Sequence, residues 1–167
     1  MNKIRSLILA ILCVFISGVP AHALDPNQPA SSFLRTHFTT DEGLPRAVVD
    51  HIQQTNDGFL WLITNRDNLS RFDGKNFFNL TKPRPGTLTL APNGDLWLGT
   101  LEGLIHMPSA NFNKFTLSGL VSYNPGPGKA SQVWCLRFSS SGVLWVGTAD
   151  GLFRYDGGNQ FVAVGPR

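Results

Sequence analysis

Four histidines are the residues of this chain best suited to metal binding or to acid–base chemistry. They are His22, His37, His51 and His106. A zinc site brings several such side chains together, as in the His-Glu-x-x-His motif, which places two histidines on one face of a helix. None of the four histidines has a metal-ligand spacing, and the last three fall on expected strands. We therefore interpret these three as surface or packed strand residues and predict no metal site.

Four aspartates could supply the carboxylates of a catalytic pair. Each of them directly precedes a glycine, and they are Asp57, Asp73, Asp150 and Asp156. In turns of this kind the aspartate side chain accepts hydrogen bonds from local backbone amides, which gives it a structural role. The sequence also lacks a Gly-x-Ser-x-Gly elbow, a phosphate-binding loop and paired cysteines. We predict no catalytic residue and no cofactor, and the sequence assigns no ligand-binding residue.

Three tryptophans could form a platform on which sugars stack. Trp61, Trp97 and Trp145 each occupy the same place in a run that is apolar on both faces. Such a run is typical of a strand that is covered on both sides, where a large aromatic side chain fills the space between layers. We therefore predict that the tryptophans belong to the core, with ligand stacking as the alternative.

The tryptophans belong to a unit that is written three times. Its copies are Asp57–Thr64, Asn93–Thr100 and Ser141–Thr148, and the tryptophans are 36 and then 48 residues apart. A repeat period of roughly 35–50 residues is typical of solenoids and propellers. Asp-Gly and Asn-Gly pairs favour tight hairpins, so each unit predicts four short antiparallel strands, which make a propeller blade.

The predicted fold class is therefore all-β, with about three four-stranded antiparallel β-propeller blades that form an incomplete ring. The first blade spans 47–80, and its middle turn has Asn68 where the other copies have glycine. Because asparagine tolerates the left-handed conformation, we expect this turn to survive. The second blade spans 86–117, with its last strand at Phe115–Leu117, and the third spans 132–164.

Two segments lie outside the blades. Residues 118–131 are rich in glycine and proline, which predicts a surface loop; a plain connector is favoured, with a ligand-facing loop as the alternative. The N-terminal segment 24–46 contains an alternating run at 33–38 and an Asp-Glu-Gly-Leu-Pro turn. A strand at 33–38 would have the role of closing a propeller ring.

The first 23 residues predict an export signal. A basic start with Lys3 and Arg5 precedes an apolar run and an Ala-His-Ala cleavage site, which places the mature chain in the periplasm or outside the cell. Without the signal, twelve Lys and Arg face eleven Asp and Glu, so no electrostatic footprint for a nucleic acid remains. Cys13 is also removed, and Cys135 lies in an apolar run that predicts a buried, unreactive side chain.

The order of motifs resembles a known family. Asp41–Pro45, Asp57–Trp61, Leu69–Gly74 and Gly151–Gly157 are similar to the start of the two-component-regulator propeller, the periplasmic sensor region of bacterial sensor histidine kinases. The resemblance covers nearly all of the mature chain. It implies about fourteen blades in two propellers, followed by an immunoglobulin-like domain, a membrane helix and an output module. That module is most often a histidine kinase and sometimes a diguanylate cyclase, and several relatives bind oligosaccharides.

We interpret the chain as a noncatalytic, ligand-sensing propeller segment of a two-component signal transduction sensor. One alternative is a fragment of a propeller lyase or lactonase, whose channel would carry recurring carboxylates or histidines. The other is an interaction module that assembles with further copies. The expected partners are a small-molecule or oligosaccharide ligand, and missing blades or other copies. A membrane would be met only through the signal or a downstream segment. Three blades expose two apolar faces, so we expect the chain alone to aggregate, oligomerise or remain partly unfolded.

Overall fold

The computed structural model describes residues 35–80, 82–113, 119–126, 131–158 and 160–165. The chain divides into two units, Met1–His37 and Phe38–Arg167, and the described strands all belong to the second. The predicted signal peptide lies outside the described residues. Within those residues, no helix is long and apolar enough to cross a membrane.

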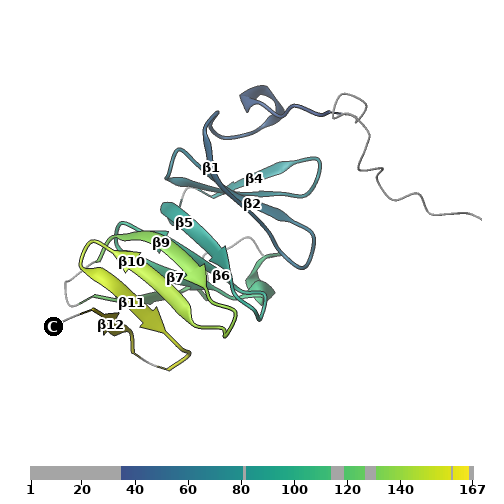
Figure 1. Cartoon of the computed structure of the whole chain (residues 1–167). Helices are drawn as coiled ribbons and strands as arrows, with labels where there is room; N and C mark the ends of the chain where they lie inside the picture. The colour runs from purple at the N-terminus through teal and green to yellow at the C-terminus, as the bar shows by residue number, and fades with distance from the viewer. Residues whose placement is uncertain (1–34, 81, 114–118, 127–130, 159, 166–167) are drawn as a thin grey trace, which may run out of the picture. The chain divides into compact units, whose positions relative to one another are not determined.

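Among the described residues, twelve strands form three four-stranded antiparallel sheets, and each sheet follows the order of the chain (Figure 1). This confirms the predicted all-β fold with three blades. Blade 1 contains β1 (Val49–Gln54), β2 (Leu60–Thr64), β3 (Asn68–Phe72) and β4 (Phe77–Leu80); blade 2 contains β5 (Pro85–Leu90), β6 (Leu96–Thr100), β7 (Gly103–Met107) and β8 (Val121–Tyr123); blade 3 contains β9 (Val133–Phe138), β10 (Leu144–Thr148), β11 (Gly151–Tyr155) and β12 (Val162–Val164).

The three blades repeat one register. In each blade the tryptophan of the second strand pairs with the fourth residue of the third strand, which gives Trp61–Arg71, Trp97–His106 and Trp145–Arg154. The glycine of each first turn has a positive φ, between 81° and 89°, as the Asp-Gly and Asn-Gly signals predict for blades 1 and 2; in blade 3 this glycine follows Ser141. Equivalent residues in the three blades can therefore be compared directly.

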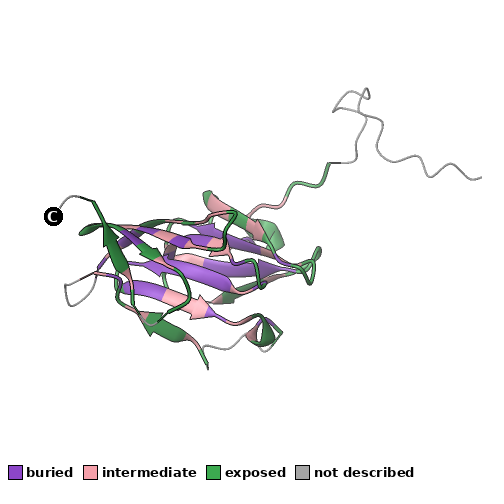
Figure 2. Ribbon diagram, turned by 60° about the horizontal axis from the view of Figure 1, so that its bottom comes forward, coloured by how far each residue is buried: buried purple, intermediate pink, exposed green. Residues whose placement is uncertain are grey.

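The hydrophobic core lies between successive blades. Trp61, Ile63 and Leu69 of blade 1 pack against Leu96 and Leu98 of blade 2. Blade 2 in turn packs against blade 3, through a cluster that comprises Ala91, Trp97, Leu104, Val133, Leu144, Val146 and Phe153. The inner strands are central to both contacts, since β5 lies against β1 and β2, and β9 lies against β5 and β6. Figure 2 shows the resulting buried strands, with exposed segments around them.

The face of blade 1 that points away from blade 2 is partly covered by the chain that precedes it. Phe38 and Leu44 pack with Leu62 and Phe72, and Gly43 lies close to Phe77. Between Phe38 and Leu44 the chain forms a short 3-10 helix, η2 (Thr40–Glu42), which Thr39 and Glu42 cap reciprocally. The Asp-Glu-Gly-Leu turn seen in the sequence thus supplies a lid for the outer strands of blade 1.

The structure departs from the prediction for the fourth strand of blade 2, confirms that the glycine-less turn of blade 1 survives, although other residues make it, and describes the predicted ring-closing strand only in part. The fourth strand of blade 2 is Val121–Tyr123, inside the predicted loop 118–131, while the predicted strand Phe115–Leu117 lies outside the described residues. The intervening chain forms η3 (Ser109–Asn111) and buries Phe112 against Trp61, which delays the return of the fourth strand.

The left-handed residues of the glycine-less turn are Asn65 and Arg66, whereas Asn68 begins β3. This turn has one more residue than the equivalent turns of the other two blades, so the chain has already reversed direction when it reaches Asn68. The described part of the predicted ring-closing strand, Arg35–Phe38, is not in a strand, and its role in ring closure stays a prediction.

Candidate functional site

A hollow of about 730 Å³ lies where blade 2 is connected to blade 3. One wall is the end of β8 with the following Asn124–Gly126 segment, and the other wall comes from the β10–β11 turn, β11 and β12. The lining residues combine polar and aromatic side chains: Ser122, Tyr123, Asn124, Pro125, Gly126, Asp150, Phe153, Gln160, Phe161 and Ala163. A ligand in this hollow would touch two blades at once.

The floor of the hollow is held by a polar network. The side-chain oxygen of Asn124 accepts hydrogen bonds from the amides of Gly126 (3.4 Å) and Ser131 (3.2 Å), and the Ser131 hydroxyl donates to Asp150 Oδ2. Because Ser131 is buried, its hydroxyl makes this contact out of reach of water. A Cβ at Gly126 would lie 2.0 Å from Ser131 Oγ, so only glycine allows this close approach.

The Asp150 carboxylate thus links the connecting loop to the β10–β11 turn. Its own amide donates to Thr148 Oγ1 (3.0 Å), and that hydroxyl donates to the Gly151 carbonyl (3.0 Å), which fixes the turn. The sequence predicts for Asp150 only the role of a local turn residue. Its longest-range bond, to Ser131, could not be seen from the adjacent residues.

An aromatic cluster forms the wall behind the polar network. Tyr123 of β8 lies 5.9 Å from the ring of Phe161 and 5.9 Å from that of Tyr155. Tyr155 stacks on Phe161 at 4.8 Å, and Trp97 lies behind both tyrosines. Burial, followed by the neighbouring Tyr123, raises the pKa of the Tyr155 phenol, so this group stays protonated and can act as a hydrogen-bond donor.

A second hollow of about 700 Å³ occupies the equivalent place between blades 1 and 2. Here Glu102 stands at the β6–β7 turn, as Asp150 does at the β10–β11 turn. Its chemistry differs, because basic Lys82 and Arg84 and aliphatic side chains such as Leu101 and Ile105 take the places of the amides and aromatics. The hollow itself is therefore a consequence of the repeat, while its lining is particular to each connection.

The predicted site residues do not converge. His37 is exposed outside any strand, His51 is half-buried in β1, and His22 lies outside the described residues. Asp73 accepts the amides of Lys75 (2.8 Å) and Asn76 (2.7 Å), and these bonds lower its pKa; Asp57 accepts the Thr55 hydroxyl (2.6 Å). Among the described residues, no three His, Cys, Asp or Glu side chains are placed to hold a metal.

His106 forms a contact that sequence analysis missed. Its Nε2 lies 2.9 Å from Asp95 Oδ2, and its ring stacks on Trp97 at 4.5 Å. Burial acts to raise the pKa of Asp95, but hydrogen bonds from Ser109, His106 and Asn93 outweigh it and lower that pKa below its ordinary value. The pairing joins the start of β6 to the end of β7 and to η3, so its geometry is structural.

The predicted burial holds for two of the three tryptophans and not for Cys135. Trp61 and Trp97 are buried at 1% and 6% exposure in the contacts between blades, as predicted, while Trp145 is only half-buried. Cys135 is exposed, so the prediction of a buried thiol is wrong. It pairs with Gly147 on the face of blade 3 that points away from blade 2.

The described blades are similar to solved propeller domains. The extracellular domain of the proposed one-component system BT4673 from B. thetaiotaomicron aligns over 78% of this chain with a TM-score of 0.64 and 16% identity. A second structure of the BT4673 extracellular domain, described there as a proposed hybrid two-component system, aligns over 78% of this chain with a TM-score of 0.61 and 16% identity. The extracellular domain of BT3049, a proposed hybrid two-component system from the same organism, aligns over 72% of this chain with a TM-score of 0.53 and 18% identity.

These likenesses establish the fold. The chain spans 18% of the length of both BT4673 structures and 17% of BT3049, so it corresponds to a small part of each neighbour. No protein-family model matches the sequence, and a search of curated proteins found no match.

Proposed function

We propose that this chain is a noncatalytic, ligand-sensing propeller segment of an extracytoplasmic sensor in two-component signal transduction. The observation that carries the proposal is the alignment of three consecutive blades, over 78% of the chain, with an extracellular domain of a proposed signalling system. The predicted export signal supports the same location. The output of such a sensor, of the histidine kinase type, would be carried by other domains.

The hollow between blades 2 and 3 is the proposed ligand site. Aromatic side chains at Tyr123 and Phe161 provide flat apolar surfaces, while Asn124, Asp150 and Gln160 provide hydrogen-bonding groups. This combination suits a neutral polyhydroxylated ligand such as an oligosaccharide, because sugars present apolar ring faces edged by hydroxyls. A ligand held by both blades would change how they pack, and a sensor would pass that change towards the membrane.

A binding experiment on the purified chain tests the proposal. A panel of neutral oligosaccharides is titrated calorimetrically against the chain and against Asp150→Asn and Gln160→Ala variants. We expect both variants to weaken binding at least tenfold. Glu102→Gln, at the equivalent turn of the other hollow, is the matched control and should leave the affinity unchanged.

Two results would count against the proposal. Unchanged affinity in both hollow variants would remove the hollow as the ligand site, provided that thermal unfolding shows each variant to be folded. Chemical conversion of a bound sugar by the chain would contradict the noncatalytic role and favour the lyase alternative.

A further inference from the structure

The blade 1–2 hollow, the second of the two hollows, has no part in the proposed function, which places the ligand between blades 2 and 3. Its volume of about 700 Å³ is within the range of small-molecule sites. Its walls are the connection between β4 and β5, the β6–β7 turn, and strands β7 and β8. The hollow therefore has the size and the enclosure to hold a ligand of its own.

The apolar wall of the blade 1–2 hollow is aliphatic. By strand register, Ile105 and Leu120 occupy the places that Phe153 and Phe161 hold in the other hollow. Both aliphatic side chains are half-buried and pack against the core cluster between blades 1 and 2, so they are held in place while part of each stays exposed. Such a wall has no flat ring on which a sugar stacks, but it can bury a branched aliphatic group.

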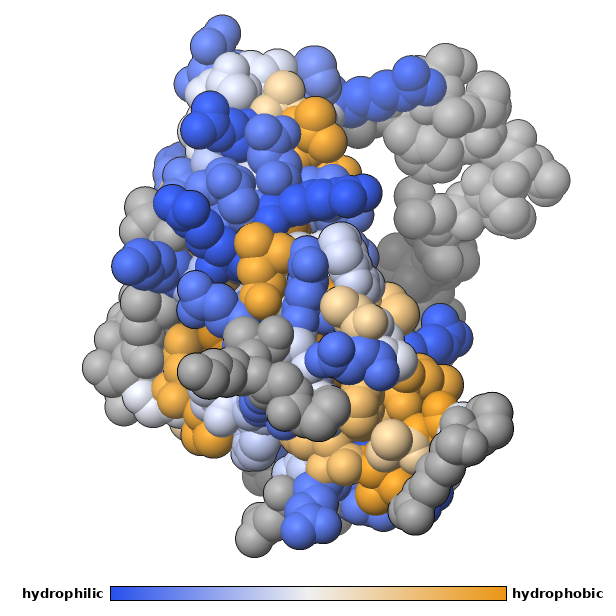
Figure 3. Space-filling view, turned by 90° about the vertical axis from the view of Figure 1, so that its left-hand side faces the viewer, coloured by the Kyte–Doolittle hydropathy of each residue, from blue (hydrophilic) through white to orange (hydrophobic). Residues whose placement is uncertain are grey.

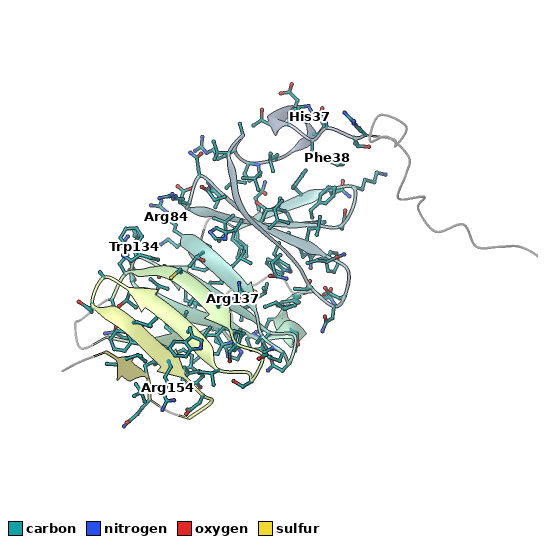
Figure 4. All side chains as sticks on the ribbon, in the orientation of Figure 1. His37, Phe38, Arg84, Trp134, Arg137 and Arg154 are labelled. Atoms are coloured by element: carbon teal, nitrogen blue, oxygen red, sulfur yellow. The ribbon has the colours of Figure 1, made fainter. Side chains whose placement is uncertain are left out.

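Three exposed charged side chains line the same hollow. Lys82 and Arg84 lie on the β4–β5 connection, and Glu102 lies on the β6–β7 turn. None of the three forms an ion pair with any residue in the described part of the chain. Figure 3 views the molecule from the side on which Arg84 is labelled in Figure 4; hydrophilic side chains predominate over its upper half and hydrophobic ones gather over its lower half. Both signs of charge are therefore available to a ligand beside an apolar wall.

The backbone that carries the positive charges is held before any ligand binds. Arg84 lies between Pro83 and Pro85, so a proline ring fixes the backbone φ on either side of it. Pro85 begins β5 and is paired with Thr100 at the end of β6. Because this segment is already ordered, a ligand that meets Arg84 loses less binding free energy to ordering the chain.

The turn that carries the negative charge is fixed as well. The buried Thr100 hydroxyl accepts a hydrogen bond from the Glu102 amide (3.0 Å) and donates one to the Gly103 carbonyl (2.9 Å). Gly103 has a φ of 124°, and a Cβ there would lie 2.6 Å from the Tyr123 carbonyl oxygen, so this position requires glycine. The Glu102 carboxylate therefore projects from a backbone of defined position.

An aliphatic amino acid has all the groups that complement this lining. Its carboxylate can accept charge-assisted hydrogen bonds from Arg84 and Lys82, while its ammonium group can donate to Glu102. Its branched side chain can lie against Ile105 and Leu120. A simple fatty acid would leave Glu102 facing an anion, and a neutral sugar would leave all three charges without a partner.

We propose that the blade 1–2 hollow binds a small zwitterion with an aliphatic side chain, either a free amino acid or a short peptide. The positive charges at Lys82 and Arg84 hold its carboxylate, and Glu102 holds its ammonium group. This site goes beyond the proposed function, since it does not depend on oligosaccharide binding between blades 2 and 3.

Calorimetric titration of the purified chain with L-leucine and its analogues tests the site. We expect saturable binding of L-leucine. Binding should be about tenfold weaker or worse for N-acetyl-L-leucine, which lacks the ammonium group, for L-leucinamide, which lacks the carboxylate, and for L-alanine, which lacks the branched group. Leucyl-leucine carries the same three features, so tighter binding of this dipeptide than of L-leucine would identify a short peptide as the ligand, and any other result the free amino acid.

Two variants assign the charges of the ligand to their partners. Arg84→Gln should weaken L-leucine binding about tenfold but should not weaken that of L-leucinamide, because this analogue has no carboxylate for the arginine to hold. Glu102→Gln should weaken L-leucine binding to a similar extent but not that of N-acetyl-L-leucine. The matched control is Arg154→Gln, which removes an exposed arginine from the outer face of blade 3, the face that points away from blade 2 (Figure 4). It should leave every affinity unchanged.

Three results would overturn the proposal, with thermal unfolding used to show that each variant is folded. Neither L-leucine nor leucyl-leucine binding would mean that the hollow is not a site for such zwitterions. Equal affinity for hexanoate and L-leucine would indicate a simple anion site in which Glu102 has no role. Equal weakening of L-leucine and the matching analogue by a variant would show that its side chain does not meet the group assigned to it. None of these results bears on the oligosaccharide titration, which concerns the other hollow.

Discussion

The face that blade 2 presents to blade 3 and the outer face of blade 3 differ in surroundings far more than in sequence. Both carry Trp, Gly and Leu at the same register positions, within strands of the same length. Yet Leu104 is buried and Leu152 is 40% exposed. The repeat sets the conformation of each blade, whereas the burial of its side chains depends on the neighbouring blade. Identical substitutions at equivalent positions should therefore have unequal effects.

The largest difference in lost stability is expected between alanine substitutions of Leu104 and Leu152. Leu104→Ala removes a side chain that is 1% exposed from the core between blades 2 and 3, and should destabilise the chain by about 3 kcal/mol, through lost burial and a residual cavity. Leu152→Ala should cost less than about 1 kcal/mol in the monomer, because its side chain already contacts water. Urea unfolding at low protein concentration measures both. Equal losses would mean that the two faces are equally buried.

A smaller difference in lost stability is expected between alanine substitutions of Gly99 and Gly147, which each lie two residues after a tryptophan. Gly99→Ala places a methyl group 2.6 Å from Thr87 Cγ2 and Val133 Cγ1, between two sheets, so we expect a loss of about 2 kcal/mol from overpacking. Gly147→Ala meets only the Sγ of exposed Cys135, which can turn away. Its cost should stay below about 1 kcal/mol. Thermal unfolding of the two variants provides the comparison, and a more severe effect at Gly147 would contradict it.

The arginines beside Trp61 and Trp145 should also differ. Arg71 is 8% exposed, lies over the rings of Phe59 and Phe78, and donates a hydrogen bond to the Phe112 carbonyl of blade 2. Arg71→Met should therefore cost about 1.5 kcal/mol, the usual worth of a hydrogen bond from a charged group. Arg154→Met, on the exposed face of blade 3, should leave the stability of the monomer unchanged in the same urea titration. A comparable loss at Arg154 would show that blade 3 already holds it in place.

The sequence predicted the parts of this structure that depend on local signals. Three copies of one unit gave three sheets, and an Asp-Gly, an Asn-Gly and a Ser-Gly pair marked their first turns in chain order. Contacts made across the chain escaped prediction. The fourth strand of blade 2 was misplaced, because the chain first buries Phe112 between blades. Cys135 looked buried because its neighbours are apolar, but burial of its face requires a further blade. The candidate hollow depends on the bond between Ser131 and Asp150, which are 19 residues apart.

The smallest effect expected is a pH dependence that belongs to blade 2 alone. By strand register, Asp95 and His106 of blade 2 correspond to Val143 and Arg154 of blade 3, so blade 3 lacks this acid–histidine pair. Because hydrogen bonds lower the pKa of folded Asp95, its ionised form stabilises the fold above the ordinary carboxyl pKa of about 4. That contribution is lost as the pH falls through the lowered pKa.

Asp95→Asn should therefore destabilise the chain at pH 7 by less than about 1 kcal/mol, since the pair is partly exposed and screened by solvent. The difference from the unsubstituted chain should begin to shrink as the pH falls below about 4, and should vanish below the lowered pKa of folded Asp95, where the Asp95 carboxyl is as uncharged as the asparagine that replaces it. Urea unfolding at a series of pH values measures this difference. Val143→Asn, the matched change in blade 3, should give a difference that does not vary with pH. If the Asp95→Asn difference were also constant, the hydrogen bonds to Asp95 would not be the source of the pH dependence.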